Sequence, residues 1–417
     1  MNDVGPKTIL CLASYEKGGA FIQACKRRGW RTLLLTVTAL ERAAWPRESL
    51  DDIFYMPDLS DVDAARRGVA YLARSQSIDR IVALDDYDVE TAAALREHLC
   101  LPGTDGTMGG MGTTAARAVR DKLTMRVRAR AAGVLVPDFA SVANDAALTD
   151  YLARVPGPWV LKPRAEVSTI GISRIEDPEE VWARLDAAGD RRSLYLIERY
   201  IPGTVYHVDS LVDGGETLLA EVHEYGRPPL NVYHDGGTFV TRTLPRDSDD
   251  ARALHALNGQ ALAALGFARG ATHLEFIKGH DDGRLYFLEA GARVGGAYIA
   301  DMVEAATGLN LWAEWAGIEL TTPDQPYRLP ARRRGYAGAI ISLARQEQPD
   351  TTDYQDPEIV WRLDKRHHVG FVVASPDPAR VAALLDDYAR RFADDFVATL
   401  PPHTGRPQIS EPAPPTE

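Results

Sequence analysis

The segment THLEFIKGHDDGRLYFLEAGARVGG, residues 272–296, places one glutamate in each of two apolar stretches that flank a turn signal. These glutamates are Glu275 and Glu289. The Asp-Asp-Gly sequence at 281–283 is typical of a three-residue hairpin loop closed by a left-handed glycine. A hairpin with this loop places Glu275 directly opposite Glu289 on the neighbouring strand.

Two opposed carboxylates on paired strands repel each other, and an apolar setting also deprives them of hydration. Either one of them is protonated or a cation lies between them. Mg²⁺ fits such a place, because it usually binds one or two carboxylates together with substrate phosphates. The alternative, in which both glutamates are solvated on an exposed face of a sheet, is equally open from this segment alone.

The length of the chain, 417 residues, predicts about two to four domains. The composition, 45% hydrophobic and 25% charged, is ordinary for a globular protein. A net charge of −12 without a dense basic run argues against nucleic acid as the main partner, which would require a basic surface.

The N-terminal sequence has no long apolar region after a basic start, and no window of the chain reaches the length of a membrane span. Cys11, Cys25 and Cys100 form no CxxC motif and are expected to be buried thiols in a reducing compartment. These features predict a cytoplasmic protein that does not bind a membrane.

Short apolar runs alternate with helical patterns in the first hundred residues, which predicts a parallel α/β sheet. The expected strands are 8–14, 32–37 and 79–86. The Lys17–Gly19 loop lacks the GxGxxG pattern and is interpreted as a strand-to-helix turn, while Asp85 and Asp86 are interpreted as helix caps.

The rest of the chain is expected to be mixed in secondary structure. The pattern predicts a basic helix within 104–134, a hairpin at 205–226, helices at 251–267 and 298–320, and strands with one helix after about residue 330. Residues 401–417 are Pro-rich without apolar periodicity, which predicts disorder.

Six charged residues occur in a distinctive order and context. Lys122 opens a helix in RDKLTMR, Lys162 ends a strand in WVLKPR, and Glu198 lies in the strand exit IERYIPG. The acid pair follows, and Arg293 comes four residues after the second acid. Each of these has an ordinary structural explanation by itself, such as a solvated helix lysine or a strand-end lysine.

Together, in this order and spacing, the residues resemble the ATP-grasp superfamily of ligases over about 120–320; no P-loop is present. The resemblance implies an α/β protein with the ATP-grasp fold. The expected domains are an N-terminal α/β domain at 1–115, a nucleotide-binding and catalytic domain at 116–325, a small C-terminal α+β subdomain at 326–400, and the tail at 401–417.

The resemblance also implies a role for each charged residue. Lys122 would reach the phosphates of ATP, and Lys162 would lie between the adenine and the α-phosphate. Glu275 and Glu289 would hold one or two Mg²⁺ ions, with Mn²⁺ as an alternative. Arg293 would stabilise charge on the transferring phosphoryl group, since phosphoryl transfer depends on positioning and charge neutralisation.

Two further segments are implied to contact the nucleotide. A small loop would close over the β- and γ-phosphates through backbone N–H groups; its residues include Glu166, Ser168, Thr169, Ile170 and Gly171. A hinge strand would present the backbone of its first and last members to the adenine; its residues are Glu198, Arg199, Tyr200 and Ile201.

The sequence departs from the family pattern in two places. The pattern Glu-x-Asn-x-Arg has Gly291 where the family has Asn, so a second metal site would be weaker or completed by water. Val205 stands where an acid often binds the ribose, and either His207 or Asp209 is expected to take that role.

The acid motif without Asn and the KPR…STIGI loop most resemble carboxylate–amine ligases, including those that join amino acids. The segment 224–239 is either a substrate lid or a surface crossover. Arg227, Tyr233 and His234 in it are candidates to contact a carboxylate or an amine.

The resemblance therefore implies an ADP-forming ligase that activates a small carboxylic acid as an acyl phosphate and joins it to an amine. A carboxylase that uses bicarbonate and a non-catalytic nucleotide-binding module are the alternatives. Arg293 argues against the module, because a protein that only binds nucleotide has little need of it. A homodimer is left open.

Overall fold

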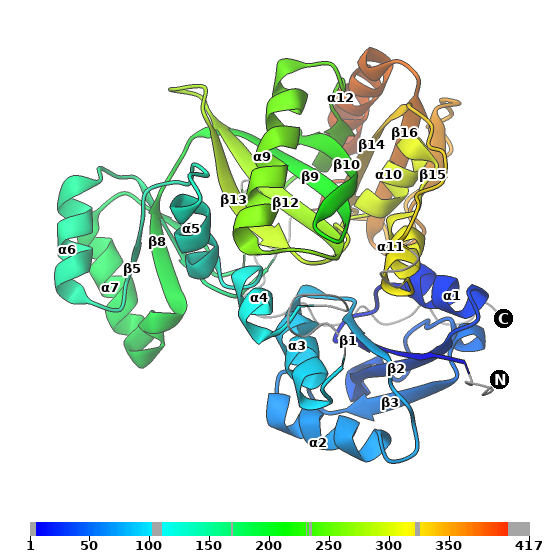
Figure 1. Cartoon of the computed structure of the whole chain (residues 1–417). Helices are drawn as coiled ribbons and strands as arrows, with labels where there is room; N and C mark the ends of the chain where they lie inside the picture. Colours follow the sequence, from blue (N-terminus) through cyan, green and yellow to red (C-terminus); the bar gives the residue numbers. More distant parts are fainter. Residues whose placement is uncertain are drawn as a thin grey trace.

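Three β-sheets organise the computed structural model of the chain, which describes residues 6–101, 111–167, 170–230, 232, 236–321 and 326–398 (Figure 1). The tail 401–417, for which disorder is predicted, lies outside the described residues. No helix in the described ranges is long and apolar enough to cross a membrane.

The N-terminal sheet is parallel, as the alternation of strands and helices predicts. Its strand order is β3-β2-β1-β4, with β1 (Thr8–Ala13), β2 (Arg31–Val37), β3 (Asp52–Met56) and β4 (Arg80–Ala83). The helices of this part are α1 (Gly19–Arg27), α2 (Val62–Leu72) and α3 (Val89–His98). Strand β3 is an addition to the predicted set; it begins at the exposed Asp52, and it pairs with β2 at one edge of the sheet.

Two predictions for this part of the chain, a turn and three buried thiols, can be compared with the structure. Gly18 precedes α1 with a φ of 75°, so the Lys17–Gly19 loop is the strand-to-helix turn that was predicted. The thiols of Cys11 and Cys25 are buried, but Cys100 is exposed. The prediction of three buried thiols is therefore wrong for Cys100, which follows α3 in a left-handed turn with a φ of 49°.

A second, smaller sheet is antiparallel and lies at the left of Figure 1. Its order is β5-β8-β6-β7, with β5 (Phe139–Ser141), β8 (Tyr195–Arg199), β6 (Trp159–Pro163) and β7 (Ser173–Ile175). Helices α6 (Asp145–Arg154) and α7 (Pro178–Ala188) pack on it around a separate apolar cluster.

Two helices connect the first and second sheets, where one long helix was predicted. They are α4 (Thr113–Ala118) and α5 (Lys122–Ala131). The break occurs because Asp121 adopts an extended conformation and caps α5, accepting from the backbone N–H groups of Leu123 and Thr124.

The third sheet has eight strands in the order β13-β12-β9-β10-β11-β14-β16-β15. The strands are β9 (Gly203–Asp213), β10 (Glu216–Tyr225), β11 (Phe239–Thr243), β12 (Gly270–Gly279), β13 (Leu285–Gly291), β14 (Tyr336–Leu343), β15 (Ile359–Arg362) and β16 (His368–Ser375). The helices of this part are α9 (Asp249–Leu265), α10 (Ile299–Thr307), α11 (Leu311–Glu319) and α12 (Pro378–Asp395).

Two features of this sheet differ from the predicted elements. Strands of the expected C-terminal subdomain do not form a sheet of their own, because β14 pairs with β11 and continues the central sheet. The helix predicted at 298–320 is divided at Gly308, whose φ of 79° ends α10.

The hairpin of β12 and β13 pairs Glu275 with Glu289, as predicted. Beyond this pair the register shifts, since Phe276 lies opposite Phe287 and leaves Leu288 as an extra residue. The predicted three-residue loop is therefore wrong by one residue: the backbone N–H of Gly279 bonds to the carbonyl of Arg284 at 2.9 Å. The bulge at Leu288 takes up the difference, and such bulges are frequent next to active sites.

Candidate functional site

A cleft with an empty volume of about 940 Å³ lies between the second sheet and the hairpin of β12 and β13. Most of the predicted site residues line it: Lys122, Lys162, Glu166, Ile170, Glu198, Arg199, Tyr200, Ile201, Glu275 and Glu289. The fold thus brings together residues that are more than 160 positions apart in the chain.

Lys162 and Glu198 form an ion pair on adjacent strands β6 and β8, with Nζ and Oε1 2.5 Å apart. Arg126 of α5 binds the other carboxylate oxygen, with its Nε 2.9 Å from Oε2. Burial lowers the pKa of Lys162 to about 8, although Glu198 opposes this shift. Burial alone would raise the pKa of Glu198, but Arg126 and Lys162 lower it.

Arg126 was not among the predicted site residues. It lies four residues after Lys122 on α5, so both side chains project from the same face of the helix. This spacing was the only available signal. Arg126 is fully buried. Lys162 therefore shares its carboxylate partner, Glu198, with a second buried cation.

Lys122 is held at the first position of α5 by local contacts. Its backbone N–H donates to the carbonyl of Arg164 at 2.8 Å, and its Nζ donates to the carbonyl of Glu166 at 2.6 Å. Nζ also lies 3.2 Å from Oε2 of Glu289. The lysine therefore links the small loop to one of the paired acids.

The paired acids have few partners of their own. Glu275 accepts a hydrogen bond from the hydroxyl of Tyr225 at 2.9 Å. The side chain of Glu289 is 34% exposed, and burial, which would raise its pKa, is outweighed by Lys122 and Lys162, which lower it. Both carboxylates are available to a cation in the cleft.

The small loop contributes Glu166, Val167 and Ile170 to the cleft wall. Gly171 has a φ of 72°, and a Cβ there would lie 2.9 Å from Cγ of Pro163, so the turn requires glycine. Ser168 and Thr169, the predicted contacts at the centre of this loop, lie outside the described residues.

In the hinge strand, two of the backbone donors are already occupied. The N–H of Arg199 donates to the carbonyl of Asp138 at 2.7 Å, and the N–H of Tyr200 donates to the carbonyl of Pro158 at 2.9 Å. Arg199 and Tyr200 thus line the cleft without a free backbone donor.

Arg293 does not line the cleft but lies beside it, against the N-terminal sheet. Its Nε donates to Oδ2 of Asp86, and its Nη1 donates to the carbonyl of Val294 at 2.9 Å. The interpretation of Asp86 as a helix cap is therefore wrong, because its carboxylate accepts from the guanidinium of Arg293, two residues after the end of β13. Asp85 is a cap, as predicted, and accepts from the N–H of Tyr87 at 3.1 Å.

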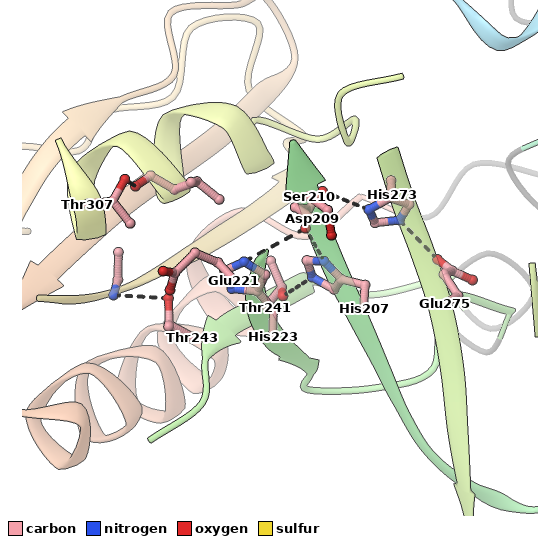
Figure 2. A network of polar contacts seen from close by, with 12 residues as sticks. His207, Asp209, Ser210, Glu221, His223, Thr241, Thr243, His273, Glu275 and Thr307 are labelled. Carbon is pink, nitrogen blue, oxygen red and sulfur yellow. Dashed lines mark hydrogen bonds and ion pairs between the residues drawn. The ribbon is translucent and has the colours of Figure 1, made fainter. Parts of the chain in front are cut away.

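A buried histidine cluster lies next to the acids on β9, β10 and β12 and consists of His207, Asp209, His223 and His273 (Figure 2). Asp209 bonds Nδ1 of His207 at 2.6 Å and Nδ1 of His273 at 3.0 Å. His207, Asp209 and His273 could hold a metal ion by their composition. In the structure they instead hydrogen-bond to one another, and His207 also bonds Thr241 at 2.7 Å.

Charge within this cluster is balanced internally. Burial alone would lower the pKa of His273, but the neighbouring Asp209 raises it to about 9. Burial lowers the pKa of His223 well below its ordinary value. Burial also lowers the pKa of His207. The cluster therefore combines the carboxylate of Asp209 and a cationic His273 with two further imidazoles, whose pKa values burial lowers.

The prediction that His207 or Asp209 binds the ribose is wrong. Both side chains have no exposed surface, and the ring of His207 packs against Tyr225 with centroids 4.6 Å apart. Val205, two residues earlier on β9, does line the cleft, but it is apolar. No acid on this strand is available for a sugar hydroxyl.

The segment 224–239 reaches the cleft through Pro228, Pro229 and Leu230. Arg227 donates to the carbonyl of Gly236 at 3.3 Å, which folds the segment on itself. Tyr233 and His234, two of the predicted substrate contacts, lie outside the described residues.

The residues of the cleft fit a nucleotide and a hard divalent cation. Apolar walls from Val160, Ile172 and Leu288 suit a base, and two lysines suit phosphates. Two opposed carboxylates supply the oxygen ligands that Mg²⁺ prefers.

Comparisons with known proteins show which family and which solved structures this chain is similar to. Residues 155–301 match the family described as ATP-grasp domain. The L-arginine-specific L-amino acid ligase of Bacillus subtilis is 23% identical over 277 residues, an alignment that spans 65% of this chain and 64% of that relative. The chain thus spans less than two thirds of the length of this relative.

Solved structures share the fold. The L-amino acid ligase from Bacillus licheniformis superimposes with a TM-score of 0.73 at 19% identity, covering 94% of this chain and 99% of that chain. The biotin carboxylase domain of the Hydrogenobacter thermophilus 2-oxoglutarate carboxylase, in complex with MgADP, gives a TM-score of 0.68 at 17% identity over 93% of this chain and 90% of that chain. The predicted ATP-grasp fold and the predicted resemblance are confirmed.

Proposed function

We propose that this chain, which has the ATP-grasp fold and an ATP-grasp domain at residues 155–301, is an ADP-forming carboxylate–amine ligase. The single observation that carries the proposal is the meeting of two lysines and two opposed acids in one cleft. Lys122, Lys162, Glu275 and Glu289 come from four different elements, α5, β6, β12 and β13, and all of them line that cleft.

The roles of these residues follow from their chemistry. The ammonium groups of Lys122 and Lys162 neutralise phosphate oxygens of ATP. Glu275 and Glu289 hold Mg²⁺, which supplies further positive charge to the phosphates when it is bound. Arg293 lies next to these acids and is suited to charge that develops on the transferred phosphoryl group.

Two steps complete the reaction. A carboxylate oxygen of the acid substrate attacks the γ-phosphorus, the bond to the β,γ-bridging oxygen breaks, and ADP leaves. The amine nitrogen then attacks the carbonyl carbon of the acyl phosphate, inorganic phosphate leaves, and the nitrogen loses a proton. The protein serves both steps by positioning and by neutralising charge.

The substrate class is proposed from the relatives. The Bacillus subtilis relative is named an L-arginine-specific L-amino acid ligase, and the Bacillus licheniformis structure is an L-amino acid ligase. An amino acid or related small acid is therefore the proposed carboxylate. An acyl phosphate hydrolyses readily, so the site must exclude water. Described residues of the small loop and of the segment 224–239 line the cleft and cover part of it: Glu166, Val167, Ile170, Pro228, Pro229 and Leu230.

A carboxylase that activates bicarbonate is the second candidate, because a biotin carboxylase domain shares the fold. Release of ADP from a panel of amino acids, with and without bicarbonate, separates the two. The ligase predicts ADP release that depends on a particular organic acid, and hydroxylamine should trap that acid as a hydroxamate when the amine is withheld. Release of AMP and pyrophosphate, or stimulation by bicarbonate alone, would refute it.

A further inference from the structure

Asp86 connects the N-terminal sheet to the acid pair. It follows β4, is 2% exposed, and binds the Nε of Arg293 through Oδ2. Its other oxygen, Oδ1, has no hydrogen-bond partner among the described residues. A buried polar atom without a hydrogen-bond partner lowers the stability of the fold by about 1–3 kcal/mol. We therefore expect this oxygen to bind a group that is not part of the chain.

The free oxygen faces a glycine. A Cβ at Gly291 would lie 3.2 Å from Oδ1 of Asp86 and 3.6 Å from Oδ2. Gly291 is two residues after Glu289 on β13, so a side chain there would project from the same face of the strand as Glu289. The carboxylate of Asp86 thus takes the space that a side chain at 291 would need, beside one of the paired acids.

The surroundings keep Asp86 ionised. Burial alone would raise its pKa, but Arg293, Arg120 and Lys17 lower it to about 2. Two of these cations have other partners, since Arg120 donates to the carbonyl of Ala165 at 2.5 Å and Lys17 pairs with Asp85. Asp86 is therefore an anion with one oxygen bound and one oxygen unused.

We propose that Asp86 supplies a third carboxylate oxygen to the cation held by Glu275 and Glu289, in the space that Gly291 leaves open. Its other oxygen fixes Arg293 beside the same cation. This inference rests on the proposed function. It also means that the N-terminal sheet and the central sheet both contribute to the metal site, although they are far apart in the sequence.

The role of Arg293 in this arrangement is set by its contacts. Asp86 occupies Nε and the carbonyl of Val294 occupies Nη1, so within the described residues Nη2 is the guanidinium nitrogen without a hydrogen-bond partner. Asp86 is accordingly a positioning residue for Arg293 as well as a metal ligand. Its loss should change cation binding and not only turnover.

Mn²⁺ binding to the full chain in the presence of ADP tests the proposal. Free Mn²⁺ is measured by electron paramagnetic resonance for wild type, Asp86→Ala, Gly291→Asn and the double variant. Asp86→Ala should weaken Mn²⁺ binding by about tenfold or more. Gly291→Asn should also weaken it, because the new side chain meets Asp86. The double variant should bind Mn²⁺ more tightly than either, because the amide oxygen at 291 takes the vacated position.

Asp85→Asn is the matched control. It alters the neighbouring aspartate and its pair with Lys17 but keeps a capping side chain, and it should retain wild-type Mn²⁺ affinity. Melting temperatures show whether each variant is folded. If Asp86→Ala does not fold, the predicted loss of Mn²⁺ affinity in Gly291→Asn still tests the proposal.

The outcomes distinguish the proposed role of Asp86 from the proposed function of the protein. Equal Mn²⁺ affinity in wild type and Asp86→Ala, or a double variant no tighter than Asp86→Ala, would overturn the role of Asp86 while the proposed function stands. Absence of ADP-dependent Mn²⁺ binding in the wild-type protein would overturn both.

Discussion

The acid pair and the histidine cluster are neighbours on one sheet, yet they use their polar groups in opposite ways. Glu275 lies two residues after His273 on β12 and pairs with His207 of β9. The side chains of His207 and Asp209 have no exposed surface, whereas those of Glu275 and Glu289 are 18% and 34% exposed. Figure 2 shows the contact between His273 and Glu275, which joins the two groups.

Hydrogen bonding explains the difference better than residue type does. Asp209 has both of its oxygens bonded to imidazoles at 3.0 Å or less. The hydrogen bond from Tyr225 and the 3.5 Å contact with His273 both involve Oε1 of Glu275, and Glu289 has a 3.2 Å contact with Lys122. Both glutamates can therefore still bind an added cation. A buried polar cluster that satisfies itself stabilises the fold, and one that retains unused acceptors facing a cleft is suited to a ligand.

The largest expected effect comes from breaking the histidine cluster. Asp209→Ala leaves the cationic His273 buried without its carboxylate, and it should lower the free energy of unfolding by about 3–5 kcal/mol. Urea denaturation measures this change. A loss below about 1 kcal/mol, the size of a typical net hydrogen bond, would mean that the cluster is not held together by Asp209.

A smaller effect, on turnover rather than on stability, is expected from the acid pair. Glu289→Gln removes a charge from the cation site and should lower kcat by about 10²–10³, a barrier increase of about 2.7–4 kcal/mol. The free energy of unfolding should change by less than about 0.5 kcal/mol, since the side chain is partly exposed. Near-normal kcat in the folded variant would contradict the metal-ligand assignment.

A pH dependence should follow from Lys162. Its pKa of about 8 means that the free protein loses this ammonium as the pH rises through about 8. The charge that we propose to bind phosphate is present below that pH and lost above it, so kcat/KM for ATP should fall on the alkaline side.

Lys162→Arg is the matched variant for this pH profile, because it keeps the cation but removes the titration. Its kcat/KM is expected to be lower but flat between pH 7 and about 9, within which arginine stays protonated. An alkaline limb that persists unchanged in Lys162→Arg would assign it to another group.

The smallest effect is expected at His223, the member of the cluster whose ring nitrogens have no hydrogen-bond partners among the described residues. His223→Phe keeps a ring of similar size against His207 and should change the free energy of unfolding by less than about 1.5 kcal/mol. Turnover should be unchanged. A loss as large as that of Asp209→Ala would show that His223 is charged or bonded in solution.

Local pattern predicted much of the site. The alternation of strands and helices predicts the parallel sheet, and the turn signal predicts that Glu275 faces Glu289; the structure agrees on both. The bulge at Leu288 could not be predicted, because it depends on how the hairpin packs. The same limit applies to His207, since a histidine on a strand beside cleft residues gives no sign that its side chain will be buried among the residues of the two neighbouring strands.

Contacts between distant segments account for the remaining residues. Asp86 looks like a cap because it follows a strand and precedes a helix, and only the packing of the N-terminal sheet against β13 brings it to Arg293, 207 residues later. Arg126 likewise looks like one basic residue among several on α5 until β8 supplies Glu198. The sequence predicts which residues of one helix or strand lie on the same face, but it does not predict which side chains of distant elements form ion pairs.

The fate of one oxygen atom tests the proposed reaction most directly. The substrate acid is labelled with ¹⁸O in its carboxylate, and the phosphate released during ATP-dependent ligation is analysed by mass spectrometry. If the acid attacks the γ-phosphorus and the amine then displaces phosphate, one ¹⁸O atom must appear in inorganic phosphate, together with ADP. Unlabelled phosphate, or label in AMP with release of pyrophosphate, would contradict the acyl-phosphate ligase.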